Sequence, residues 1–208
     1  MRTFNISHPA ADAMDWNEAM RVIHELLDDD RYRDAMLVGT GCFLGLRISD
    51  ILRLRWCDVL DDDIIKVREK KTKKLRPLKI SRPYRQLAKR CHEEMFIEDD
   101  NEYIFKSWQY GGKKPICRGH SHDILKKIQR DYNIRSAKVF SSHSLRKTFG
   151  RRVWEAECEK GRGENALVLL CDVFGHSNVA ITKRYLGIRQ TEILSVYDTV
   201  AQAENFSA

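Results

Sequence analysis

The chain has 208 residues, of which 42% are hydrophobic and 32% charged, and its formal net charge is +7 at pH 7. This balance is typical of a folded globular protein and excludes a disordered chain, while no apolar run approaches the roughly 20 residues that span a bilayer. The N-terminus has no apolar signal region and the six scattered cysteines form no C-x-x-C pair, so we expect a cytoplasmic protein with reduced thiols and no membrane contact.

Capping residues and hydrophobic periodicity predict a mainly α-helical α+β protein. Asp15–Glu18 is typical of a capping box that opens a helix running to about Leu27. Residues 32–46 predict a buried helix whose three glycines indicate close neighbours, and Ser49 is predicted to cap a short helix after it. Further helices are predicted at 83–96, 121–131, 143–157, 164–173, 178–187 and 190–201.

The positive charge is concentrated in one segment. From Ile64 to Arg90 there are twelve Lys and Arg residues and a single acid, Glu69, so the rest of the chain is net acidic. Two antiparallel strands, 64–67 and 75–80, are predicted inside this segment. A basic run is often only a solvated face, but its coincidence with a hairpin favours a surface that binds nucleic acid.

The last third of the chain carries residues suited to phosphate chemistry. His143 and Arg146 form an H-x-x-R, and if Ser142 caps a helix both side chains leave one face of its first turn. That helix start also points N–H groups and a positive dipole end at an anion. With His176 and, nine residues further on, Tyr185, these residues suffice for covalent phosphoryl transfer without a metal.

Several of these residues also have plainer interpretations when taken singly. Arg47 and Asp50 by themselves match a surface ion pair three residues apart, and a tyrosine in an amphipathic helix usually belongs to the core. His120 and His122 lie near Cys117, but their spacing matches no standard zinc site. The sequence therefore predicts neither a metal nor another cofactor.

The order of the motifs resembles the catalytic domain of the tyrosine recombinase (phage integrase) family. A first box matches Thr40–Asp50 and continues to Trp56; the second is His143–Phe149, followed by Phe174–Ser177 and Thr182–Tyr185. The basic hairpin lies between the two boxes, as in the family. Each box alone has modest specificity, whereas their order over nearly the whole chain is highly specific. The resemblance implies the family's mainly helical fold, with a small antiparallel hairpin that carries a catalytic lysine.

The resemblance also implies a site-specific recombinase that cuts and rejoins double-stranded DNA through a 3′-phosphotyrosine. Tyr185 would be the nucleophile, and Arg47 and Arg146 would hold the non-bridging oxygens of the scissile phosphate. Lys71, at the hairpin tip, would protonate the departing 5′-oxygen as general acid. No metal or cofactor is needed in this chemistry.

The remaining site residues follow from the same resemblance. His143 would accept or relay the proton of Tyr185, His176 would hydrogen-bond the phosphate, and Asp50 would support Arg47 without being catalytic. Basic side chains beside these residues are expected to contact DNA: Lys70, Lys73, Lys74, Arg76, Lys147, Lys183 and Arg184.

Three departures from the family pattern carry expectations of their own. The hairpin tip Lys71–Lys74 lacks the usual glycine, which predicts a changed turn and leaves Lys70 or Lys73 open as the general acid. The stretch 159–164 is an apparent insertion and predicts a surface loop. Residues 1–14 are expected to be a lead-in and 15–208 the catalytic domain, without the N-terminal helical domain that usually closes around DNA.

Other functions share much of this pattern. A type IB topoisomerase or a telomere resolvase uses the same residues, and a DNA-binding regulator with a decayed site is a more distant alternative. The intact set of basic residues, imidazoles and tyrosine disfavours the last. The resemblance further implies a homotetramer assembled on DNA, a monomer in solution, accessory DNA-bending proteins as possible partners, and a nucleoid-associated location.

Overall fold

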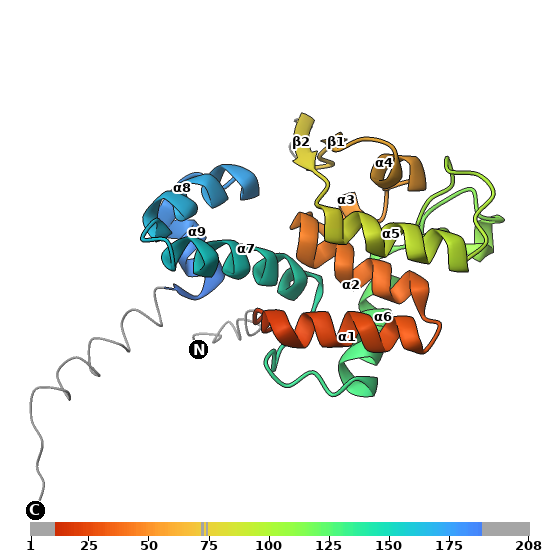
Figure 1. Ribbon diagram of the computed structural model, residues 1–208, viewed down its shortest axis with the longest axis horizontal. Coiled ribbons are helices and arrows are strands. Elements are labelled where there is room, and N and C mark those ends of the chain that lie inside the picture. The colour runs from red at the N-terminus through yellow and green to blue at the C-terminus, as the bar shows by residue number, and fades with distance from the viewer. Residues whose placement is uncertain (1–10, 72, 74, 189–208) are drawn as a thin grey trace, which may run out of the picture. The chain divides into compact units, whose positions relative to one another are not determined.

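The structure is a computed structural model that describes residues 11–71, 73 and 75–188. It divides into two compact units, Met1–Phe149 and Gly150–Ala208, and the boundary falls inside helix α7 (Ser142–Cys158). In the first unit, α2 lies between α1 and α5 (Figure 1). The elements of this unit that precede α7 are α1 (Trp16–Asp28), α2 (Tyr32–Leu44), α3 (Ile48–Ile51), α4 (Trp56–Leu60), β1 (Ile64–Arg68), β2 (Leu75–Lys79), α5 (Arg82–Glu94), the 3₁₀ helix η1 (Trp108–Tyr110) and α6 (Arg118–Asp131).

Helix α1 begins as its sequence predicts, but only half of the capping box forms. The Asp15 side chain accepts hydrogen bonds from the amides of Asn17 at 2.8 Å and Glu18 at 3.1 Å. The Glu18 carboxylate does not turn back to Asp15; it accepts from the amides of Arg135 and Ser136, each at 3.0 Å. Glu18 therefore ties the start of α1 to the segment that precedes α7.

Two glycines of the α2 region, Gly41 and Gly45, make room for α7, in line with the close neighbours that the sequence predicts. A Cβ atom on Gly41 would lie 2.5 Å from that of Leu145, and one on Gly45 would lie 2.4 Å from the ring of Phe149. Gly45 also ends α2 in the left-handed conformation, with φ of 57°, which suits glycine. The close approach places the end of α2 against the first turns of α7.

The predicted hairpin is confirmed. Strands β1 and β2 pair antiparallel, with Ile65 opposite Leu78, and both of these side chains are buried. Lysines and arginines alternate with them on the exposed face. Because strand side chains alternate between faces, this register turns Lys66, Arg68 and Lys79 outward, where Ile64 and Leu75 are also exposed. Arg76 lies on the same face as Ile65 and Leu78 and is largely buried.

Two short helices differ from the prediction. Helix α3 begins at Ile48, with Arg47 rather than Ser49 as its N-cap, so the predicted cap is wrong by two residues. Helix α4 was not predicted, since its five residues are too few to show a helical period. Its start is stabilised by Asp58, whose carboxylate accepts from the amide of Arg55 at 2.8 Å.

The second unit contains the end of α7, α8 (Gly163–Phe174) and α9 (Val179–Leu186), and α8 packs against α9. Asn178 caps α9 by accepting from the amide of Ile181 at 3.0 Å. The predicted surface loop is confirmed as an exposed turn between α7 and α8. The helix predicted at 190–201 lies outside the described residues.

None of the described helices is by itself long and apolar enough to cross a membrane. Helices α8 and α9 together have the required length and composition, but a bend of 93° separates them.

Candidate active site

Two predicted arginines meet at the end of α2. Arg47 leads into α3 in an extended conformation, two residues after Gly45. Arg146 lies in α7 and is 4% exposed, and its Nη1 donates a hydrogen bond to the Gly45 carbonyl at 2.5 Å. The contact joins residues 101 positions apart. It fixes one guanidinium beside the backbone that carries the other, as a pair of phosphate-binding arginines requires.

His143 lies one helical turn before Arg146 and is exposed. Ser141, not the predicted Ser142, accepts a hydrogen bond from the His143 amide, at 3.2 Å. Partial desolvation lowers the pKa of His143, and the positive charges of Arg146 and Lys147 lower it further. A lowered pKa keeps the imidazole neutral at neutral pH, which is the form that accepts a proton.

Arg118 is a basic residue of this site that the sequence prediction missed. Its charge also contributes to the lowered pKa of His143. The predicted helix began at residue 121, which left Arg118 in a loop, whereas α6 begins at Arg118 itself. The signal was the cap at Cys117, whose sulfur accepts from the His120 amide at 3.4 Å.

The carboxylate that contacts Arg47 is Glu69, not the predicted Asp50. Arg47 Nη1 lies 2.9 Å from Glu69 Oε2. Asp50 is buried, and its Oδ1 accepts from the Lys70 amide at 2.9 Å and from the Ser49 hydroxyl at 3.3 Å. Asp50 therefore supports the hairpin, and the carboxylate beside Arg47 is that of Glu69.

Lys70, Lys71 and Lys73 are all exposed at the hairpin turn. Lys73 occupies the position that is glycine in the family pattern, and its φ is 60°. Its amide donates to the Glu69 carbonyl at 2.9 Å. The turn therefore keeps a left-handed residue without glycine, at a cost of about 1 kcal/mol, which favours the alignment that assigns the lysine role to Lys71.

Two of the residues predicted to contact DNA are largely buried. The Arg76 side chain is 13% exposed, with Nη1 3.9 Å from Glu69 Oε1, and Lys147 is 9% exposed. Burial lowers the pKa of Arg76, while its ion pair with Glu69 acts in the opposite direction. Side chains this deep are poorly placed to neutralise a phosphate, so the prediction of DNA contacts for Arg76 and Lys147 is not supported by their positions.

The second unit brings His176 and Tyr185 together. Their ring centroids are 5.3 Å apart in an edge-to-face arrangement, and Phe174 packs against both rings. His176 Nδ1 lies 2.9 Å from the hydroxyl of Thr182, which is fully buried. Helix α9 thus presents the predicted nucleophile beside an imidazole that is already oriented. Three predicted DNA contacts remain. Lys183 pairs with a carboxylate of α8 at 3.0 Å, Arg184 is exposed, and Lys74 lies outside the described residues.

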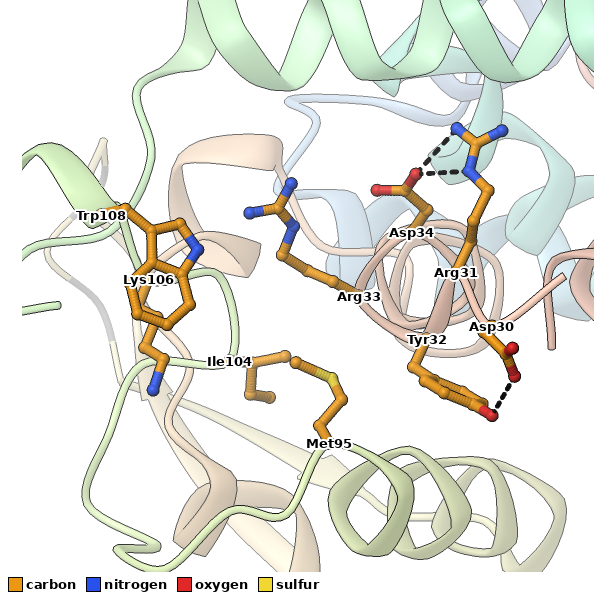
Figure 2. A pocket seen from close by; sticks show the side chains of 9 residues that line it. All are labelled: Asp30, Arg31, Tyr32, Arg33, Asp34, Met95, Ile104, Lys106 and Trp108. Carbon is orange, nitrogen blue, oxygen red and sulfur yellow. Dashed lines mark hydrogen bonds and ion pairs between the residues drawn. The ribbon is translucent and has the colours of Figure 1, made fainter.

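A separate pocket lies between the start of α2 and the 104–108 segment (Figure 2). Figure 2 shows Trp108 on one side and the polar side chains of α2 on the other. None of the predicted site residues lines this pocket. Its charged groups are largely satisfied internally, since Arg31 pairs with Asp34 at 2.8 Å and the Tyr32 hydroxyl donates to Asp30 at 2.6 Å. We assign it no role in catalysis. Among the described residues, no three His, Cys, Asp or Glu side chains are grouped as a metal site would require.

Comparison with known proteins agrees with this arrangement. The model of the phage integrase family matches residues 12–192. The curated protein "Probable integrase/recombinase YoeC" of Bacillus subtilis (strain 168) is 31% identical over 180 residues, which cover 86% of this chain and 91% of that protein. The chain therefore belongs to the phage integrase family and is a tyrosine-type site-specific recombinase.

Solved structures share the fold. The crystal structure of XerA recombinase aligns with a TM-score of 0.66 at 21% identity, covering 96% of this chain and 66% of that one. XerH, bound to palindromic difH substrate in a post-cleavage complex, aligns with a TM-score of 0.64 at 18% identity, covering 95% of this chain and 56% of that one. The present chain thus spans just over half to two thirds of these relatives. The mainly helical fold with one small antiparallel hairpin is confirmed.

Proposed function

We propose that this protein cuts and rejoins double-stranded DNA at specific sites through a 3′-phosphotyrosine formed on Tyr185. The Tyr185 oxygen attacks the scissile phosphorus, a P–O bond to tyrosine forms, and the bond to the 5′-oxygen breaks. His143 accepts the phenolic proton, and Lys71 gives a proton to the departing 5′-oxygen. Attack by the 5′-hydroxyl of another strand reverses these steps and restores a phosphodiester without ATP.

The arginines stabilise charge in this reaction. Arg47 and Arg146 bind the two non-bridging oxygens, because a guanidinium fork matches their geometry and stays protonated. Donors that are held in place before the reaction contribute most where negative charge develops. Arg146 meets that condition through its bond to the Gly45 carbonyl. His176 adds a further hydrogen bond to the phosphate.

One observation carries the proposal above the others. Within the first unit, both arginines and His143 gather around the end of α2, beside a hairpin whose lysines are exposed. Within the second unit, an oriented imidazole lies beside the only tyrosine of the family's final motif. Both groups of residues lie within the stretch that the phage integrase family model matches. Family membership therefore supports assigning them to a single reaction.

Trapping a covalent adduct tests the function directly. A DNA duplex with a nick close to a candidate cleavage site loses its short 5′-hydroxyl fragment after attack, so religation fails and the protein stays linked to DNA. We expect a 3′-linked adduct that survives denaturing electrophoresis and maps to the peptide containing Tyr185. The absence of adducts on any nicked substrate that the protein binds would contradict the proposal. Relaxation of supercoiled DNA without strand exchange would favour a type IB topoisomerase instead.

DNA binding is expected to depend strongly on salt, through the exposed lysines of the hairpin. Each phosphate neutralised contributes a slope of about −0.9 to log K against log salt concentration. Replacing Lys70 and Lys73 with alanine should therefore flatten the slope by one to two phosphates, about 0.9–1.8. Titrations by fluorescence anisotropy at several salt concentrations measure the change.

Two further variants serve as controls for this titration. Lys126→Ala with Lys127→Ala removes two exposed lysines of α6 and should leave the slope nearly unchanged. Arg76→Ala should also leave it nearly unchanged, because that side chain is buried beside Glu69. An equal loss of slope in all three variants would place the DNA surface elsewhere.

We also propose that four copies assemble on two DNA sites while the free protein is monomeric, and that DNA-bending proteins assist assembly. Exchange between duplexes needs one nucleophile for each of four strands, and each copy supplies one Tyr185. Sedimentation with and without a bound duplex measures the change in mass. A tetramer that forms without DNA would exclude this order of assembly.

A further inference from the structure

Glu69 is an acid in an unexpected place. It is the only acidic residue among twelve basic ones between Ile64 and Arg90, and it is 5% exposed. A buried carboxylate is unfavourable unless it is paired. Here it lies against two guanidinium groups, with Arg47 Nη1 2.9 Å from Oε2 and Arg76 Nη1 3.9 Å from Oε1. The negative charge of Glu69 therefore stabilises the two neighbouring arginines and is not part of the exposed surface.

The exposed fractions of the three side chains indicate that Glu69 lies behind Arg47. The Glu69 side chain is 7% exposed, that of Arg76 13% and that of Arg47 21%. A guanidinium has five N–H donors, so one edge of Arg47 can face Glu69 while other donors face the solvent from which DNA arrives. A carboxylate held behind an arginine restricts the rotation of its guanidinium and orients the opposite edge before substrate binds.

A second contact links the same two segments, but here the carboxylate lies on α3 and the donor on the hairpin. Glu69 follows β1 and reaches Arg47 at the start of α3, while Asp50 of α3 accepts from the Lys70 amide just after Glu69. The two carboxylates thus join α3 to the hairpin twice, once through the Glu69 side chain and once through the Lys70 amide. This double link is next to Lys71, so it also limits movement at the base of the turn.

We propose that Glu69 is a positioning residue that orients Arg47 for the scissile phosphate; the inference rests on the function proposed above. Its carboxylate does not touch the DNA. Arg76 lies beside the other carboxylate oxygen, so Glu69 Oε2 holds Arg47 toward the phosphate. Without the negative charge, two guanidinium groups would repel each other inside a partly buried site.

Glu69→Gln tests this role, because it removes the charge and keeps nearly the same shape. On the nicked duplex, single-turnover formation of the Tyr185 adduct should slow by about ten- to a hundredfold, the loss typical when the partner of a functional group is removed. The dissociation constant for DNA and the melting temperature should change little. Asp34→Asn is the matched control: that carboxylate is 14% exposed and 2.8 Å from Arg31, and its loss should leave the rate within about twofold.

Two modified substrates identify the residue through which Glu69 acts. A methylphosphonate at the scissile position has no charged non-bridging oxygen at the substituted place, so it should shrink the defects of Glu69→Gln and Arg47→Ala together. A 5′-bridging phosphorothioate removes the need for a general acid and should rescue Lys71→Ala but not Glu69→Gln. Rescue of Glu69→Gln by the bridging sulfur would mean that Glu69 acts through Lys71, and would overturn the proposal.

The double variant completes the experiment. If Glu69 acts through Arg47, then Arg47→Ala with Glu69→Gln should be no slower than Arg47→Ala alone. Multiplying defects, or a Glu69→Gln protein that cleaves as fast as or faster than wild type, would overturn the inference, the faster rate indicating that Glu69 blocks the phosphate. If Glu69→Gln does not fold, Glu69→Asp, which keeps the charge but withdraws it, should show the same substrate pattern at smaller size. Absence of adducts in the wild-type protein is a different result, because it would refute the proposed function itself.

Discussion

Tyr185→Phe is expected to abolish covalent adducts while leaving DNA affinity within a few-fold of wild type. The change removes the nucleophilic oxygen and keeps the ring that packs edge-to-face on Phe174 and His176. The loss of one hydroxyl should change the free energy of unfolding by only about 1 kcal/mol, so the protein should remain folded. Denaturing electrophoresis on the nicked duplex measures adducts, and anisotropy measures binding.

A second tyrosine provides the control. Tyr197 follows Tyr185 by twelve residues in the sequence, and we expect Tyr197→Phe to form adducts at the wild-type rate. Peptide mapping of the trapped DNA distinguishes the two positions. Adducts that persist in Tyr185→Phe and map to Tyr197 would show that the nucleophile was assigned to the wrong tyrosine.

Lys71→Ala is expected to slow cleavage of an ordinary nicked duplex by about 10²- to 10⁴-fold, the range typical of general acid catalysis. A 5′-bridging phosphorothioate should restore most of this loss, because sulfur leaves as a thiolate whose conjugate acid has a much lower pKa than an alcohol. Single-turnover cleavage of the two substrates gives the ratio. The rescue is chemical, so it does not depend on how tightly the variant binds DNA.

Variants of the two arginines and of the neighbouring lysines show whether the rescue by sulfur is specific to the general acid. Arg47→Ala and Arg146→Ala should be slow on both substrates, because they stabilise the non-bridging oxygens and not the leaving group. Lys70→Ala and Lys73→Ala should cleave both substrates at similar rates. Sulfur rescue of Lys73→Ala or Lys70→Ala in place of Lys71→Ala would mean that the left-handed turn at Lys73 presents a different lysine. Rescue of none of the three would restrict the hairpin to binding the DNA backbone.

Much of the fold follows from local patterns. The capping residue at Asp15, the glycines of α2 and the alternation in the hairpin each act over a few residues, and the structure confirms the helices and strands that they predict. Short elements escaped this reasoning. Helix α4 has no measurable period, and the start of α3 depends on the backbone at Arg47 and not on a side-chain cap.

The identities of Arg47, His143, Arg146, His176 and Tyr185 came from the order of motifs along the chain, and that order was sufficient because each family motif carries its own residue types. The sequence therefore determined which family the chain belongs to, and with it the candidate nucleophile and phosphate-binding residues.

Only the tertiary structure decided which charges face solvent and which are buried. In the sequence, Arg76 is one more basic residue and Glu69 is an exception in a basic run; in the structure they form a buried ion pair that contacts Arg47. Arg118 gained its influence on His143 in the same way. The physical reason is distance along the chain: Arg47 and Glu69, like Arg118 and His143, are more than twenty positions apart, and neither periodicity nor capping carries information over that separation.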